Sequence, residues 1–189
     1  MKKTIAMILA LVLVLLCAVG ATLAWMNDKT EEKTNTFTMG GGVDIDLEEH
    51  AYDPEDPDTI TDVEIKEDHN YPLVPGTVYA KDPTVTVKAG SEDCYLFVEV
   101  IKTPDLDKLV VYELDLTGWT PLDGQNGVYW RTVQKADADQ TFHMLVGDKV
   151  TVKNAVENTG AKVDISFQAY AIQKANIADA ATAWAEFTK

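Results

Sequence analysis

Residues 83 to 101 read PTVTVKAGSEDCYLFVEVI and contain two alternating apolar runs separated by a turn. In the first run, Val85 and Val87 share one face, because successive side chains of a strand point to opposite faces. The small residues around Gly90 are typical of a turn, and the second run, Cys94 to Ile101, alternates in the same way. We therefore predict an antiparallel β-hairpin whose inward face includes Cys94.

The same period of two recurs along most of the chain, and glycine, proline or aspartate separates the runs. About ten short strands with turns between them predict an all-β protein, a two-sheet antiparallel sandwich. The Gly147-Asp148 pair is expected to form a tight hairpin turn. Besides the two runs above, the expected strands are Val43–Leu47, Thr61–Lys66, Leu109–Leu116, Val128–Val133, Phe142–Val146, Val150–Val152 and Val163–Ala171, the longest.

The period changes near the end of the chain. Ile177, Ala180, Trp184 and Phe187 recur at intervals of three and four, which predicts a short closing helix. Asp179 is the expected N-cap of this helix. We interpret the two aromatic residues of the stripe as core packing rather than as a ligand site.

Residues 1–24 have the layout of a secretory signal peptide. Two lysines precede an uncharged run, Ile5 to Val19, and small residues follow as far as Ala24. We expect cleavage between Ala24 and Trp25. An uncleaved membrane anchor is the alternative, because the 22 uncharged residues from Ile5 to Met26 are about enough to cross a ~30 Å hydrocarbon core.

The chain after this signal fits one domain preceded by an extended segment. Residues 25–42 are polar, have no helical stripe and alternate weakly near Phe37 and Met39. They end in a glycine hinge, which gives a flexible joint. The expected organisation is therefore a signal peptide at 1–24, an extended segment at 25–42 and a β domain at 43–189. The hinge residues are Gly40, Gly41 and Gly42.

The charge of the chain limits its partners. The net charge is −15, and loss of Lys2 and Lys3 leaves 14 basic against 31 acidic groups, or 14 − 31 = −17. Such a protein repels nucleic acid and anionic lipid. We therefore expect no nucleic-acid partner, and contact with a membrane only through the signal peptide before cleavage. The charge suits a secreted, extracellular protein.

An acidic stretch is the one feature that suggests a cation. Residues 44 to 68 hold 12 acidic residues and one basic residue. Converging carboxylates bind Ca²⁺, but the EF-hand spacing with its central glycine is absent. We favour a solvated acidic loop around Asp53–Asp58, whose prolines cannot donate to a sheet. Ca²⁺ binding at this loop is the alternative, and no other cofactor is expected.

The cysteines and histidines give no catalytic pattern. Cys17 leaves with the signal, so Cys94 remains alone, and its place in an alternating strand indicates a buried small apolar residue. An intermolecular disulfide is the alternative. None of His50, His69 and His143 has a second histidine four residues on, so the H-E-x-x-H zinc motif is absent. We expect no enzyme activity and no metal site.

Three segments of the chain, in this order, span nearly its whole length. They are ATLAWMNDKTEEKTNTFTMGGGVDIDL (residues 21–47), YPLVPGTVYAKDPTVTVKAGSEDCYLFVEV (71–100), and AYAIQ (169–173) with the Ala183-Trp184 pair. The first runs from the small-residue cleavage site into an aromatic residue, an Asn-Asp pair, an Asn-Thr-Phe stretch, a small loop and a short alternating strand. Together the three segments resemble the TasA/camelysin family of Gram-positive bacteria.

The resemblance implies a jelly-roll fold, export with the signal peptidase SipW and assembly into fibres of the biofilm matrix. In such fibres the extended N-terminal segment of one subunit pairs with the sheet of the next, so the partner is the protein itself. Here that segment contains Phe37, Met39 and the three hinge glycines. A non-polymerising cell-surface or adhesive domain is the main alternative. A camelysin-like metallopeptidase is a further alternative, but the residues do not support it.

Overall fold

The computed structural model describes residues 42–65, 69–154 and 162–189. The signal peptide, its cleavage position at Ala24 and Trp25, and the assembly residues Phe37, Met39, Gly40 and Gly41 lie outside the described residues. So does the expected alternation at residues 36–39.

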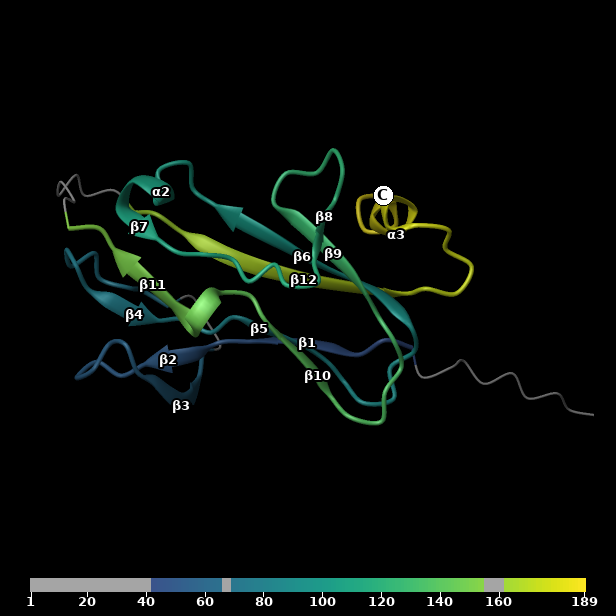
Figure 1. Cartoon of the computed structure of the whole chain (residues 1–189), viewed down its shortest axis with the longest axis horizontal. Helices are drawn as coiled ribbons and strands as arrows, with labels where there is room; N and C mark the ends of the chain where they lie inside the picture. The colour runs from purple at the N-terminus through teal and green to yellow at the C-terminus, as the bar shows by residue number, and fades with distance from the viewer. Residues whose placement is uncertain (1–41, 66–68, 155–161) are drawn as a thin grey trace, which may run out of the picture. The chain divides into compact units, whose positions relative to one another are not determined.

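The described chain consists mainly of β-strands arranged in antiparallel sheets, which confirms the all-β prediction (Figure 1). Four sheets have the strand orders β1-β5-β10, β12-β6-β9-β8, β4-β11-β7 and β2-β3. The elements are β1 (Ile45–Glu48), β2 (His50–Tyr52), β3 (Ile60–Glu64), β4 (Val78–Ala80), β5 (Thr84–Val87), β6 (Cys94–Lys102), α2 (Leu106–Leu109), β7 (Val110–Val111), β8 (Thr120–Pro121), β9 (Val128–Val133), β10 (Gln140–His143), the 3-10 turn η1 (Val146–Asp148), β11 (Lys149–Val152), β12 (Ile165–Gln173) and α3 (Ala180–Ala185).

The sheets β1-β5-β10 and β12-β6-β9-β8 pack face to face around the main core. The inward residues of β5, Val85 and Val87, are at most 1% exposed, and those of β6, Cys94, Leu96 and Val98, are fully buried. Each of these valine and leucine side chains contributes about 1.5–3 kcal/mol on burial. The alternation in residues 83–101 therefore identified the core face correctly.

The predicted hairpin between these two strands is wrong. β5 pairs with β1 and β10, whereas β6 pairs with β12 and β9, so the connection crosses from one sheet to the other. Backbone groups of this connection bind other segments: Gly90 donates to Ala136, and Glu92 donates to Gly42. An alternating pattern gives the same inward face whether two strands pair side by side or pack face to face, so it did not distinguish the two.

The second predicted hairpin fails for the same reason. The turn at Gly147-Asp148 forms, and both residues have positive φ angles of 67° and 49°. However, it joins β10 of one sheet to β11 of another. The strand expected at Leu109–Leu116 is also interrupted, because α2 ends at Leu109 and β7 has only two residues.

The C-terminal helix packs on the outer face of the β12-β6-β9-β8 sheet, as Figure 1 shows. The side chain of Asp179 accepts a hydrogen bond of 2.8 Å from the backbone N–H of Thr182, which confirms the predicted N-cap. Trp184 is buried and lies 5.3 Å from Phe97, ring centre to ring centre. The stripe is thus core packing, as expected.

A buried polar group joins the β2-β3 hairpin to the rest of the domain. The Lys81 side chain is 7% exposed, and its Nζ lies 2.7 Å from the Glu49 carboxylate. Tyr71 donates to the same carboxylate at 2.8 Å. Beside this group, the ring Nδ1 of His50 lies 2.7 Å from Oδ2 of Asp82. Because these contacts link residues more than 20 positions apart, they fix the hairpin in place.

Candidate functional site

β12, which has nine residues like β6, is an edge strand of its sheet. All nine of its residues pair with β6, from Ile165 opposite Lys102 to Gln173 opposite Cys94. On the other side of β12, no strand among the described residues continues the ladder. Its alternating inward residues were predicted correctly, but its place at the edge was not.

The hydrogen bonds beyond each end of β12 show which backbone groups face outward. The backbone carbonyl of Asp164 accepts a hydrogen bond from the backbone N–H of Thr103 at 3.0 Å. The backbone N–H of Lys174 donates to the backbone carbonyl of Asp93 at 2.7 Å. Hydrogen-bonded pairs alternate along an antiparallel ladder, so the even-numbered residues of β12 bind β6. The odd-numbered residues therefore present their N–H and C=O groups to the open edge: Ile165, Phe167, Ala169, Ala171 and Gln173.

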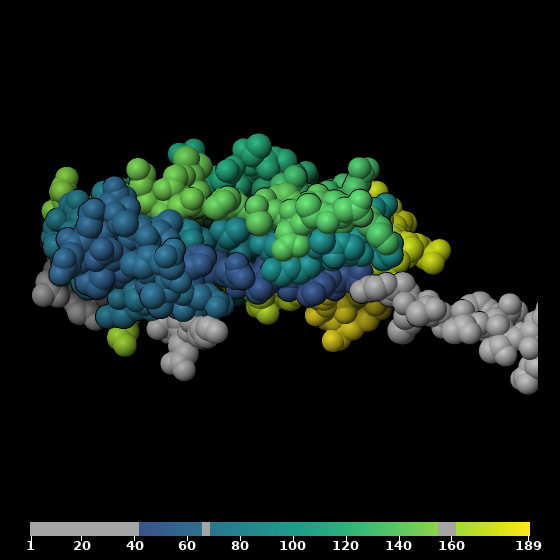
Figure 2. Space-filling model, turned by 90° about the horizontal axis from the view of Figure 1, so that it is seen from below, coloured from purple at the N-terminus to yellow at the C-terminus, as the bar shows by residue number. Residues whose placement is uncertain are grey.

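A second edge strand, β1, lies on the same side of the two packed sheets. It is the outer strand of the order β1-β5-β10, and it runs close to β12 although no ladder joins them. Figure 2 shows β1 in purple-blue on the surface seen from below, bordered by yellow-green and yellow parts of the C-terminal region. The two open edges therefore belong to one surface.

Apolar side chains on this surface are incompletely covered. They belong to the main core, yet each is only half-buried, in contrast to the fully buried inward residues of β5 and β6. Apolar area left in contact with water costs about 25 cal/mol per Å² relative to burial. We call this set the edge strip; its residues are Val43, Ile45, Leu47, Phe167, Ala169 and Ala171.

Gly42 is the only assembly residue named from the sequence that the structure describes. Its φ angle of 68° lies in the left-handed region that favours glycine. Its carbonyl accepts a hydrogen bond from the N–H of Glu92 at 3.0 Å. Gly42 is thus attached to the folded domain, three residues before the start of β1 and next to Val43 of the edge strip.

The structure does not bring the three histidines together. His50 binds Asp82, His69 packs against the rings of Tyr52 and Tyr71, and His143 contacts Asp148 at 3.1 Å. Within the described ranges, no three His, Cys, Asp or Glu side chains are grouped so as to hold a metal ion.

The acidic loop is closed by its own hydrogen bonds. The backbone N–H of Asp53 donates to the backbone carbonyl of Thr59 at 2.8 Å. The Asp53 carboxylate accepts a hydrogen bond from the backbone N–H of Glu55 at 2.8 Å. Thr59 donates to the carboxylate of Asp56 at 2.9 Å. The loop is exposed, and these contacts are local.

Cys94 is a core residue, as expected. It is fully buried, and burial raises the pKa of its thiol to about 11. A thiol that stays protonated is a poor nucleophile. Cys94 is therefore inert in the folded domain.

Comparisons of the chain with protein-family models, curated proteins and solved structures find no match. Among the helices that the structure describes, none is long and apolar enough to span a membrane.

Proposed function

We propose that this chain is a secreted structural protein, a subunit of extracellular biofilm-matrix fibres. A signal peptidase of the SipW type would release it, and the domain would be a jelly roll. The single observation that carries this proposal is the open β12 edge beside the half-buried edge strip. A protein with such an edge has a template for a further strand, and the sequence supplies a weakly alternating segment before Gly42.

In this mechanism, residues 25–39 of one subunit pair with β12 of the next. Backbone groups of the odd-numbered β12 residues bind the incoming strand, each hydrogen bond contributing about 0.5–1.5 kcal/mol. Phe37 and Met39 share one face of that strand and cover the edge strip. Burying two such side chains adds about 3–6 kcal/mol, so side chains set the register and the backbone adds affinity.

Proline substitution tests the edge directly. Ala169→Pro removes an N–H that faces the open edge and breaks no bond to β6. Gln168→Pro is the matched control, because the N–H of Gln168 belongs to the ladder with β6. We expect Ala169→Pro to fold, by circular dichroism, and to give no fibres in electron microscopy. Gln168→Pro should lower the melting temperature.

Two outcomes would contradict the proposal. If the unaltered protein stays monomeric at every concentration, fibre formation fails, and a non-polymerising surface domain is the better description. If Ala169→Pro forms normal fibres, the protein assembles but not through β12.

A further inference from the structure

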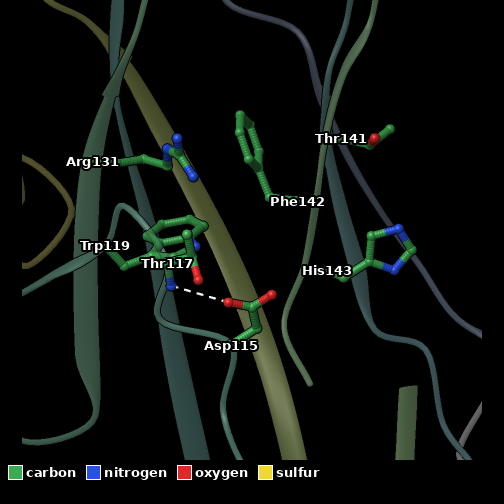
Figure 3. Close-up of a pocket in the computed structure, with 7 residues that line it drawn as sticks. All are labelled: Asp115, Thr117, Trp119, Arg131, Thr141, Phe142 and His143. Carbon is green, nitrogen blue, oxygen red and sulfur yellow. Dashed lines mark hydrogen bonds between the residues drawn. The ribbon is translucent and has the colours of Figure 1, made fainter. Parts of the chain in front are cut away.

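A cavity opens on the side of the packed sheets away from β1 and β12. It has a volume of about 200 Å³ and lies between β9 and β10, next to the segment that precedes β8. Figure 3 shows Arg131 and Trp119 on one wall and Phe142 on the other, with Asp115 below them and His143 beyond Phe142. A cavity of this size accepts a ligand of only a few heavy atoms, since drug-sized ligands occupy about 300–1,000 Å³.

Arg131 is the only arginine of the chain. It lies in β9 opposite Leu96, so its side chain points between the two sheets. Its guanidinium carbon is 4.0 Å from the centre of the Phe142 ring and 5.4 Å from that of Trp119. A Cβ on Gly118 would come within 3.2 Å of its Nη2, so glycine at this position leaves room for the guanidinium.

This guanidinium has no polar partner within the described residues. Its Nε is buried without a hydrogen bond, and no carboxylate forms an ion pair with it, although the chain has 31 acidic residues. Burial lowers the pKa of Arg131. Leaving the buried Nε unpaired costs free energy, and the remaining N–H groups of this half-buried guanidinium are able to donate charge-assisted hydrogen bonds to a ligand.

Asp115 gives the cavity a negative group at its other end. Its carboxylate accepts a 3.0 Å hydrogen bond from the N–H of Thr117. Hydrogen bonds from Thr117 lower the pKa of Asp115, burial opposes this shift, and the electrostatic interaction with His143 adds a smaller lowering. Asp115 therefore stays ionised, and it is too far from Arg131 to form an ion pair with it. A purely anionic ligand would meet attraction at one end and repulsion at the other.

The geometry points to a binding site for a small zwitterion, a free α-amino acid. Its carboxylate binds the guanidinium of Arg131, which presents a planar fork that matches carboxylate geometry. Its ammonium faces Asp115, and its side chain contacts the rings of Trp119 and Phe142. No covalent step is involved. This site lies across the core from the edge strip, so it does not depend on strand addition.

Nuclear magnetic resonance of the ¹⁵N-labelled purified protein tests this site. The readout is the indole N–H signal of Trp119, assigned by its loss in Trp119→Phe. The probes are glycine and alanine, which are small enough for this cavity, with acetate and ethylammonium carrying one charged group each. We expect saturable shifts with the amino acids, and binding at least about tenfold weaker with either single-charge probe.

Two variants separate the charges. Arg131→Met keeps an apolar stem between the rings, and it should weaken amino-acid binding about ten- to a hundredfold. Asp115→Asn should weaken amino-acid binding without weakening that of acetate. Arg131→Lys, which keeps the charge but loses the fork, gives the same test if Arg131→Met does not fold. Absence of any saturable shift, equal binding of acetate and glycine, or unchanged binding in the Arg131 variants would overturn the inference.

Discussion

The pair formed by His50 and Asp82 makes the stability of the domain depend on pH. The ring Nδ1 of His50 and its backbone N–H each lie 2.7 Å from an oxygen of Asp82. His50→Ala removes the ring contact and keeps the backbone contact. The hydrogen bond to Asp82 raises the pKa of His50 above 6.5, and burial opposes this shift. The charges of Asp82, Glu48 and Glu64 raise it further.

The sign of the effect follows from the raised pKa. The protonated ring is stabilised in the folded state, so the contribution is complete below the unfolded pKa of 6.5 and disappears as pH rises through the folded pKa. The His50 side chain is 33% exposed and that of Asp82 10%. Solvent screening therefore reduces the value of a charged hydrogen bond to about 1 kcal/mol, or about 2–4 °C in melting temperature for a domain of this size.

Urea unfolding of the unaltered protein and of His50→Ala, from about pH 5 to about pH 9, measures this difference. We expect a gap of about 1 kcal/mol at the acidic end that shrinks on the alkaline side. His143→Ala is the control for removing a histidine from an exposed site, and its effect should stay within about 0.5 kcal/mol. Parallel curves for His50→Ala and the unaltered protein, or a gap that widens with pH, would refute the reasoning.

Three further predictions concern export, assembly and the core. N-terminal sequencing of the secreted protein should begin at Trp25, and a membrane-bound product that keeps Met1 would contradict cleavage after Ala24. Deletion of residues 25–39 should leave a folded monomer without fibres, and Phe37→Asp should weaken assembly while barely changing the melting temperature; normal fibres from the deletion would exclude strand addition. Cys94→Ala should cost about 1 kcal/mol and leave fibres intact, whereas fibres that dissolve in a reducing agent would indicate an intermolecular disulfide.

The sequence predicted inward faces better than it predicted strand partners. The alternation of β12, the range of β9 and the Asp179 cap were all correct, because each depends on neighbouring residues. The two expected hairpins were wrong, because pairing is decided by residues far along the chain. The open edge of β12 was missed for the same reason: alternation identifies a face and says nothing about what lies beside the strand.

Arg131 was missed in a different way. It occupies an inward position of β9 between Tyr129 and Val133. The alternating pattern of this strand predicts an apolar side chain at that position. The signal that would have pointed to it is its rarity, one arginine in a chain of 189 residues. The packing of its guanidinium against Trp119 and Phe142 was not predictable from local sequence, because these two aromatic residues come from two other segments of the chain.

The pairing of β12 with β6 also has a consequence for when the domain is able to fold. This ladder joins residues as distant as Cys94 and Gln173, which are 173 − 94 = 79 positions apart. Chains dominated by such distant contacts fold in about milliseconds to seconds, because a long loop must close first. Since synthesis begins at the N-terminus, β6 is made well before β12. Until β12 has been synthesised, one edge of β6 stays unpaired. A nascent chain therefore exposes the backbone groups of this central strand to other chains nearby.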